Sequence, residues 1–404
     1  MAYQGRNPYD NQNRPQERSN RSASGAGRKN SRGKSGLLQG LRITQGEMDY
    51  LFLLAVGLLL AFGLVMLFSA GSARAFANFG DSLWYFKQQL KGVVLGAILM
   101  YAFSKMDYHW LEKWSGIALL GAAFLLVLVI IPGVGTTRNG ATRWLFGFQP
   151  SELAKFAIIL FFSVSLAKNQ KMLPDFLRGF LPYIVVLGVF VLLLMLEPHF
   201  SCVVLIGLTG FLLLLVAGAE IKHFFIVGIP AVVAALFLIL LEPYRLARVV
   251  SFLDPFADKQ GDGWQIVQSL YSIGSGGIFG LGLGKSRQKY LSLPEPQNDF
   301  IYSVLAEELG LIGALIVISL FIFLVVRGIK IATKAPDLFG TLLVTGIVGI
   351  VAFQALINIA VVTSSIPVTG MPLPFFSFGS TALTITMAEM GIVLNVSRQC
   401  KSLL

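Results

Sequence analysis

Asp299 is the acidic residue whose surroundings best suit chemistry, because it stands at the mouth of a long apolar run. It follows Pro294-Glu-Pro-Gln-Asn298, whose prolines end any preceding helix, and precedes Phe300-Ile-Tyr-Ser-Val. An aspartate here can cap the helix that begins at this point, and Asn298 could do the same. A carboxylate here can also take a proton from a hydroxyl as a general base. The residues alone leave both roles open.

Two further acids, Glu307 and Glu308, follow in the same run. On an α-helix, Glu307 would lie about 80° from Asp299 and Glu308 about 180° from it. Glu307 is therefore the candidate to support Asp299. Glu308 is expected to pair with a neighbouring helix.

An acid and a base stand at the head of an earlier apolar run, in Gln149-Pro-Ser-Glu152-Leu-Ala-Lys155. Residues three apart share one helical face, so Glu152 and Lys155 can meet. If this run spans a membrane, charged side chains near its head are costly to bury, so Glu152 and Lys155 are expected to be paired, functional or both. The structural alternative is an ion pair in a helix capped by Ser151. Just before this run, Arg143 has the planar guanidinium that suits bidentate contact with a phosphate.

Glu197-Pro-His199 joins two later apolar runs. If these runs span a membrane, it is expected on the same outer side as Arg143. A carboxylate and an imidazole around a proline suggest a metal or acid-base site, and a hairpin turn with interfacial polar residues is the alternative. His109, His199 and His223 are scattered along the chain, so no His-rich metal cage is expected.

The interval before Asp299 contains a predicted amphipathic helix and a glycine-rich segment. Apolar residues recur at helical spacing over Trp264–Ile273, which predicts a short helix lying on the outer leaflet. Gly274–Gly284 is not a P-loop, because Phe279 stands where that motif requires glycine. We predict a flexible hinge here. Its downstream basic residues, which could approach a phosphate, are Lys285, Arg287 and Lys289.

The segment from Ser365 to Thr381 is too rich in proline and glycine for a helix, yet it leads directly into an apolar run. Non-helical backbone at membrane depth is tolerated where it lines a cavity. A re-entrant wall is the favoured interpretation, and a long turn is the alternative. Intramembrane Gln354, Asn358 and Glu389 are expected to join neighbouring helices.

The elements that must position these residues are membrane helices. The chain has 404 residues, of which 55% are hydrophobic and 13% charged, against about 25% charged in soluble domains. We therefore predict an all-α polytopic membrane protein with about ten transmembrane helices. The apolar runs are residues 48–69, 86–103, 115–131, 152–167, 181–196, 200–217, 223–241, 301–326, 339–362 and 375–397.

Lysine and arginine in the short loops predict the orientation of these helices. Most of them fall on the side of the N-terminal tail, so both termini are expected in the cytoplasm. The interval 243–300 then forms one long extracytoplasmic loop before span eight. Residues 46–398 would be the membrane domain and 399–404 a cytoplasmic C-terminus.

Residues 1–45 form a polar tail with nine Lys and Arg against two acids, and this tail contributes much of the net charge of +11. Such a composition predicts disorder. The tail is expected to anchor the topology and to touch anionic lipid. Nucleic-acid binding is not expected, because no folded nucleic-acid-binding motif accompanies the basic residues of the tail. Cys202 and Cys400 are expected to be free thiols.

Four separated motifs, in this order, resemble the SEDS proteins, the FtsW, RodA and SpoVE group, over residues 48–397. They are Gly140-Ala-Thr-Arg143-Trp with Gln149-Pro-Ser-Glu152, the segment Trp264–Gly284, the segment Asp299–Gly310, and Pro367-Val-Thr-Gly-Met-Pro-Leu-Pro-Phe-Phe-Ser377. The resemblance implies a ten-span protein of the bacterial cytoplasmic membrane that polymerises lipid II as a peptidoglycan glycosyltransferase. It also implies a class B penicillin-binding protein as transpeptidase partner, with other divisome or elongasome proteins.

On this pattern Asp299 matches the family's essential aspartate, and Arg143, Glu152 and Lys155 match its charged cluster. Ser377 and Thr381 fall in the family's last motif and are expected to contact substrate. Three departures stand out. Gln297-Asn298 replaces the common His-Thr, Glu197-Pro-His199 replaces Gln-Pro-Asp, and Ser377-Phe-Gly-Ser380 replaces Ser-Tyr-Gly-Gly. Glu197 is then the acid that could take over from the missing aspartate.

The implied chemistry is attack by a sugar 4-hydroxyl on an anomeric carbon that carries a polyprenyl diphosphate. Asp299 would be the base, and Arg143 and Lys155 would hold the leaving diphosphate, with Lys285 or Arg287 as helpers. A divalent cation is the alternative holder of this charge. A lipid II flippase and a scaffold that only activates a transpeptidase are the competing functions. The basic tail favours division or sporulation over elongation.

Overall fold

The computed structural model is almost entirely helical, as the sequence predicts. It describes residues 46–138, 141–145, 147–241, 252–256, 261, 263–290 and 293–400, all within one compact unit. The predicted tail 1–45, the C-terminal residues 401–404 and parts of the interval 243–300 lie outside the described residues.

Within the described residues, ten long helices coincide with the ten predicted apolar runs. They are α1 (Tyr50–Phe79), α2 (Trp84–Lys105), α4 (Ser115–Ile130), α5 (Pro150–Asn169), α6 (Leu181–Leu196), α7 (Phe200–Ala217), α8 (Ile221–Leu241), α11 (Ile301–Lys334), α12 (Leu338–Val362) and α13 (Ser380–Gln399). Six of the described helices are long and apolar enough to cross a membrane, so the chain is a multi-pass membrane protein. A count of ten spans stays a prediction.

Short elements connect these helices. They are α3 (His109–Glu112), the antiparallel pair β1 (Thr136–Arg138) and β2 (Ala141–Trp144), a 3-10 turn (Gln170–Met172), a π-helical turn (Phe176–Phe180) and α10 (Trp264–Gly276). The β hairpin precedes α5 and carries Arg143 in its second strand.

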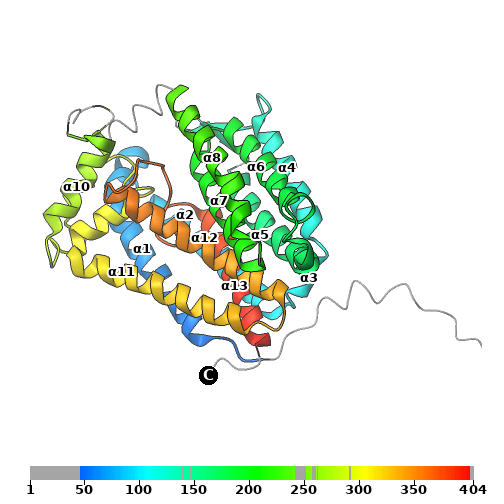
Figure 1. Cartoon of the computed structure of the whole chain (residues 1–404). Helices are drawn as coiled ribbons and strands as arrows, with labels where there is room; N and C mark the ends of the chain where they lie inside the picture. The colour runs from blue at the N-terminus through cyan, green and yellow to red at the C-terminus, as the bar shows by residue number, and fades with distance from the viewer. Residues whose placement is uncertain are drawn as a thin grey trace, which may run out of the picture. The chain divides into compact units, whose positions relative to one another are not determined.

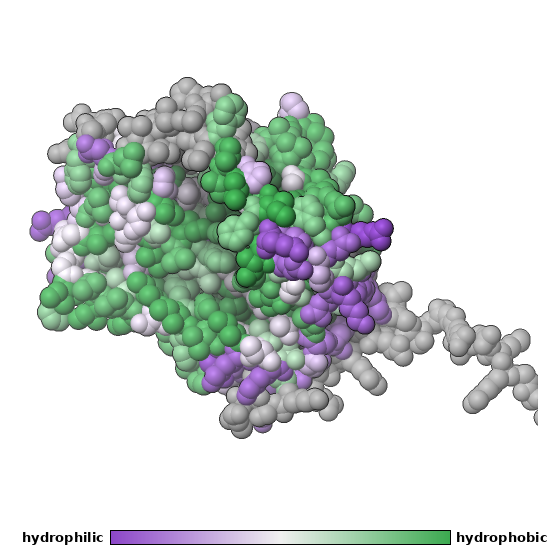
Figure 2. All heavy atoms as spheres, in the orientation of Figure 1, coloured by the Kyte–Doolittle hydropathy of each residue, from purple (hydrophilic) through white to green (hydrophobic). Residues whose placement is uncertain are grey.

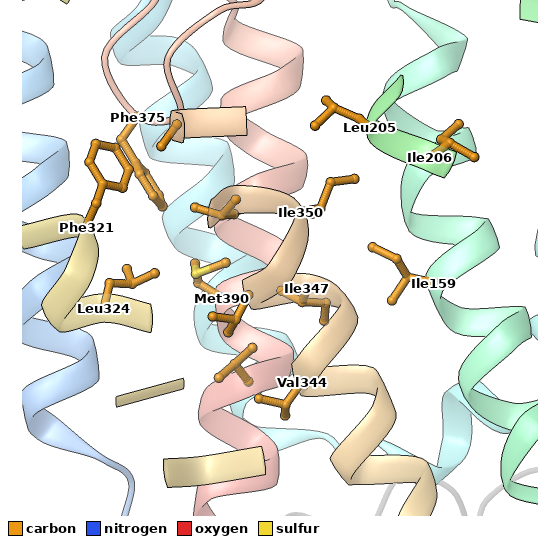
Figure 3. Close-up of a cluster of buried hydrophobic side chains, with 14 of the residues drawn as sticks. Ile159, Leu205, Ile206, Phe321, Leu324, Val344, Ile347, Ile350, Phe375 and Met390 are labelled. Carbon is orange, nitrogen blue, oxygen red and sulfur yellow. The ribbon is translucent and has the colours of Figure 1, made fainter. Parts of the chain in front are cut away.

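Helix α12 lies at the centre of the bundle and packs against α5, α7, α11 and α13 (Figure 1). Figure 3 shows the resulting core, in which Ile347 and Ile350 of α12 lie between Phe321 of α11 and Ile159 of α5. Phe375, which belongs to no helix, joins the same core. The non-helical segment before α13 is thus anchored by its apolar side chains.

Large apolar side chains also remain exposed on the outer faces of α1, α2, α4, α8 and α11. Figure 2 shows a face covered mostly by hydrophobic residues, with hydrophilic residues gathered in its lower and right-hand parts. Such a large apolar surface would be unstable in water, whereas in a bilayer it faces lipid.

Helix α11 is broken at Gly310, whose φ of 69° and ψ of −168° are not helical. The segment Gly277–Gly282 inserts at this break. The amides of Leu311 and Ile312 donate to the carbonyls of Gly277 and Ile278 at 2.9 and 3.2 Å. In return, the amides of Leu281 and Gly282 donate to the carbonyls of Glu307 and Glu308, both at 3.0 Å. The predicted hinge is therefore a wedge that satisfies the backbone of a broken helix.

Helix α10 is confirmed, but its polar side does not face outward. Ser269 and Ser272 are buried against α11, where Ser272 donates to the carbonyl of Ser303 at 3.1 Å and to Glu307 at 2.9 Å. The apolar Tyr271 is exposed instead. The polar side turns inward because the broken helix offers hydrogen-bond acceptors there.

A charged cluster joins the loop after α2 to the start of α12. The imidazole of His109 lies 2.7 Å from carboxylate oxygens of both Asp107 and Asp337, and Tyr108 donates to Asp337 at 2.9 Å. The hydrogen bond to Asp337 raises the pKa of His109, and Asp107 raises it further. Together they outweigh partial burial, which lowers the pKa, and the pKa of His109 becomes about 9. His109 is therefore an imidazolium at neutral pH and cross-links two loops.

The wedge generates a stability prediction. A Cβ at Gly280 would lie 2.2 Å from the carbonyl oxygen of Glu308, and φ at Gly280 is +80°. Gly280→Ala should therefore lower the free energy of unfolding by about 1–3 kcal/mol, the usual cost of overpacking. Thermal unfolding of the purified protein in detergent measures this loss.

Gly274→Ala is the matched control, because nothing lies within 4 Å of its added methyl group and the residue is in helix α10. It should leave the unfolding midpoint unchanged or raise it slightly. Equal midpoints for the two variants would contradict the wedge.

Candidate active site

Asp299 lies just before α11. The N-cap position is occupied by Phe300, whose side chain makes no capping hydrogen bond. Oδ1 of Asn298 has no hydrogen-bond partner, so the predicted cap by Asn298 is wrong. Asp299 is half-buried, and its Oδ2 lies 3.4 Å from where a Cβ would stand on Gly370. Its carboxylate thus lies against the segment that was predicted to form a wall.

This wall, residues 363–379, is non-helical, and residues 373–377 within it are buried. The side-chain nitrogen Nδ2 of Asn358 donates to the carbonyls of Asp299 and Met371 at 2.8 and 2.6 Å. Gln354 donates from Nε2 to the carbonyl of Pro372 at 2.9 Å. Asn358 and Gln354 were expected to join helices, but they hold the backbone of the wall. The wall and Asp299 are therefore fixed relative to each other.

Ser377 also fastens the wall. Its hydroxyl donates to the carbonyl of Asn298 at 2.5 Å and accepts from the amide of Leu373 at 2.7 Å. The predicted contact of Ser377 with substrate stays a prediction. Thr381 lies half-buried in the first turn of α13.

Glu152 and Lys155 form the predicted pair, with Nζ of Lys155 2.9 Å from Oε2 of Glu152. Each residue is 8% exposed. Nζ also lies 3.5 Å from Oε1 of Gln354, the residue that holds the wall. Helix α5 begins after Gln149, and the hydroxyl of Ser151 has no hydrogen-bond partner, so the predicted cap by Ser151 is wrong.

Arg143 is brought to the turn between α6 and α7. Its Nε donates to the carbonyl of Glu197 at 3.2 Å, and its terminal nitrogen donates to the carbonyl of Pro198. The hydroxyl of Ser201, in the first turn of α7, donates to the carbonyl of Thr369 in the wall. The β hairpin, this turn and the wall are therefore connected.

Glu307 is bound by the loop that follows the wedge. Its carboxylate accepts from the hydroxyl of Ser286 at 2.6 Å and from the amide of Arg287 at 2.9 Å. Glu308 forms a buried ion pair with Lys289 at 2.9 Å. Both acids hold the loop after the wedge. Lys289, at 3% exposed, was wrongly predicted to approach a phosphate.

Lys285 and Arg287 remain on the exposed side of this loop. Among the described residues, no three His, Cys, Asp or Glu side chains gather closely enough to hold a metal ion. The divalent cation considered from the sequence stays a prediction, and no step below is routed through it.

Comparison with known proteins identifies the family. The family model for FtsW, RodA and SpoVE, described as "Cell cycle protein", matches residues 49–402. The chain belongs to the FtsW/RodA/SpoVE family. Stage V sporulation protein E of Bacillus subtilis is 44% identical over 355 residues, covering 87% of this chain and 97% of that protein. The probable peptidoglycan glycosyltransferase FtsW of Geobacter sp. (strain M18) is 40% identical over 357 residues, covering 87% and 97%.

Solved structures of the FtsW/RodA/SpoVE family share the fold. A chain from a peptidoglycan synthase complex that coordinates polymerization and crosslinking superposes with a TM-score of 0.72 at 28% identity, covering 87% of this chain and 98% of its own. Thermus thermophilus RodA superposes with a TM-score of 0.64 at 26% identity, covering 88% and 98%. The expected family resemblance is thus confirmed over nearly the whole membrane domain.

The buried pair in this FtsW/RodA/SpoVE member generates a second prediction. Lys155→Met leaves the carboxylate of Glu152 buried without its cation, which typically costs about 3–5 kcal/mol. The double variant Glu152→Gln with Lys155→Met removes both charges and should regain most of that loss. Unfolding midpoints of the three proteins in one detergent test this, and a single variant as stable as the wild type would contradict a buried pair.

Proposed function

We propose that this chain polymerises lipid II with Asp299 as the general base. Relatives at 40% identity are named probable peptidoglycan glycosyltransferases, and the chain is a glycosyltransferase of this class. The observation that carries the role of Asp299 is that Asn358 holds its backbone against the wall, where the carboxylate lies beside Gly370.

The reaction forms a bond between the 4-hydroxyl oxygen of one sugar and the anomeric carbon of another. The bond from that carbon to the polyprenyl diphosphate breaks, and the diphosphate leaves as an anion. Asp299 takes the hydroxyl proton as the new bond develops. Direct displacement in a single step inverts the anomeric carbon, by analogy with inverting glycosidases.

The leaving diphosphate needs positive charge rather than an acid, because it departs already ionised. Arg143 and Lys155 are the proposed holders of this charge. Both lie near the turn between α6 and α7, as shown by the hydrogen bonds of Arg143 and by the effect of both cations on His199. Lys285 and Arg287, exposed on the loop held by Glu307, are secondary candidates for the same anion.

Ten spans with both termini in the cytoplasm would place the site on the outer side of a bacterial cytoplasmic membrane. The related chain from a peptidoglycan synthase complex belongs to an assembly that joins polymerization with crosslinking. We propose by analogy a class B penicillin-binding protein as transpeptidase partner, alongside other divisome or elongasome proteins. Sporulation or division is the proposed setting, in line with the relatives of those names.

Asp299→Asn tests the base directly. It keeps the size of the side chain and removes its basicity, so polymerisation of lipid II by the purified protein should fall by at least about 100-fold, the lower range for general-base catalysis. Gel separation of labelled glycan strands measures the product. Asp81→Asn, at an exposed aspartate paired with Lys87, is the control and should polymerise at the wild-type rate.

The same variants separate the competing functions. A flippase would still translocate lipid II in vesicles with asparagine at position 299, and a scaffold would show no polymerisation even in the wild type. Normal polymerisation by folded Asp299→Asn protein would contradict the proposed role of Asp299.

A further inference from the structure

Glu197 is a buried carboxyl group without a hydrogen bond. The residue is 2% exposed, and neither Oε1 nor Oε2 has a partner. Its backbone carbonyl accepts from Arg143, but its carboxyl group accepts from nothing. A bare ionised carboxylate in this environment would cost several kcal/mol, so a buried acid of this kind keeps its proton.

The neighbours of Glu197 are mostly cationic or neutral. Burial raises the pKa of Glu197 to about 8, and the positive charge of Arg143 on β2 offsets only part of this rise. On the same turn, burial together with Arg143 and Lys155 lowers the pKa of His199 to about 3, so this imidazole is neutral. Cys202 of α7 interacts electrostatically with Glu197, and also with Glu152 and Lys155 of α5. Helix α4, which packs beside α6, carries no titratable side chain.

Several polar side-chain atoms in and around the same turn have no hydrogen-bond partner. Helix α7 begins after His199 with no side-chain cap. Nδ1 of His199 and the hydroxyls of Ser151 and Thr369 are buried without partners. The carbonyl of Ser151 lies 3.9 Å from the sulfur of Cys202, and that of Thr369 accepts from Ser201, so both residues adjoin the first turn of α7. An uncapped helix start beside Arg143 favours an anionic oxygen ligand.

We infer that Glu197 works as a neutral carboxylic acid and makes binding of the substrate's diphosphate at Arg143 depend on a retained proton. This inference rests on the proposed function, in which Arg143 and Lys155 hold that diphosphate. While Glu197 is protonated, it adds no negative charge beside Arg143 and can itself donate a hydrogen bond to a phosphate oxygen. Once ionised, it repels the phosphate and neutralises Arg143.

Linkage fixes the direction of the effect. Binding of an anion favours the protonated form of Glu197, so by reciprocity loss of the proton weakens binding. Glu197 is protonated below pH 8 and ionised above it. Affinity for a diphosphate ligand should therefore be constant below about pH 7.5 and fall as pH rises through 8, by up to about tenfold per pH unit.

If Glu197 only stabilised the turn, the affinity for the diphosphate would not depend on pH in this way. The same holds if Glu197 bound a cation. A structural Glu197 would affect stability without affecting the pH profile of binding. A cation-binding Glu197 would have to be ionised, so binding would improve as pH rises. The pH profile therefore separates the three roles.

The test is the dissociation constant of farnesyl diphosphate for the purified full chain in detergent at pH 7, 8 and 9. The wild type should lose about fivefold in affinity between pH 8 and pH 9, because about half of Glu197 is already ionised at pH 8. Glu197→Gln, which has the shape of the neutral acid and cannot ionise, should change less than twofold over the same interval. The control is Glu112→Gln. Glu112 lies on the short helix α3 and pairs with Lys168, so this variant should keep the wild-type loss of affinity.

Calorimetry of the wild type alone gives a second readout if Glu197→Gln does not fold. Binding at pH 8.5 in buffers of different ionisation enthalpy should take up most of one proton. No proton uptake, or a wild-type loss that persists in folded Glu197→Gln, would overturn the inference. Because the readout is binding and not turnover, this outcome is independent of whether Asp299 is the base.

Discussion

The candidate site depends on one amide nitrogen, Nδ2 of Asn358, which donates to the carbonyls of both Asp299 and Met371. Both carbonyls belong to backbone that leaves helical geometry inside an apolar bundle. Without water, such groups must be satisfied by the protein itself. Asn358 meets this requirement for the start of α11 and for the wall together, so the position of the proposed base follows from the position of the wall.

The same requirement explains the charges that do no chemistry. The break of α11 at Gly310 frees backbone groups, and the wedge Gly277–Gly282 pairs with them. Glu307 and Glu308 then fasten the chain that follows the wedge, and the second does so with Lys289. The buried acids therefore divide into those that hold segments and those whose surroundings leave them available, such as Glu197.

The helices could be predicted from the sequence because each is a long apolar run. Most of their ends agree closely with the structure, but α1 and α11 continue well beyond the predicted runs, to Phe79 and Lys334. The partners of the polar residues could not. Helical spacing placed Glu307 near Asp299, but it carried no information on the loop after the wedge, which binds the carboxylate of Glu307. Ser377 matched a family motif, but the motif gave no sign that its hydroxyl binds the carbonyl of Asn298. The density of glycine over Gly274–Gly284 was a usable signal of close backbone approach, although it predicted a hinge.

Turnover of lipid II by folded Asn358→Leu protein tests most directly whether the wall positions the base. The substitution keeps the branching at Cγ and removes the donor shared by Asp299 and Met371. Misplacing a catalytic group by about 1 Å costs on the order of 100-fold, so kcat should fall by about that factor while KM changes little. A wild-type kcat in protein that elutes as a monodisperse peak would contradict the account.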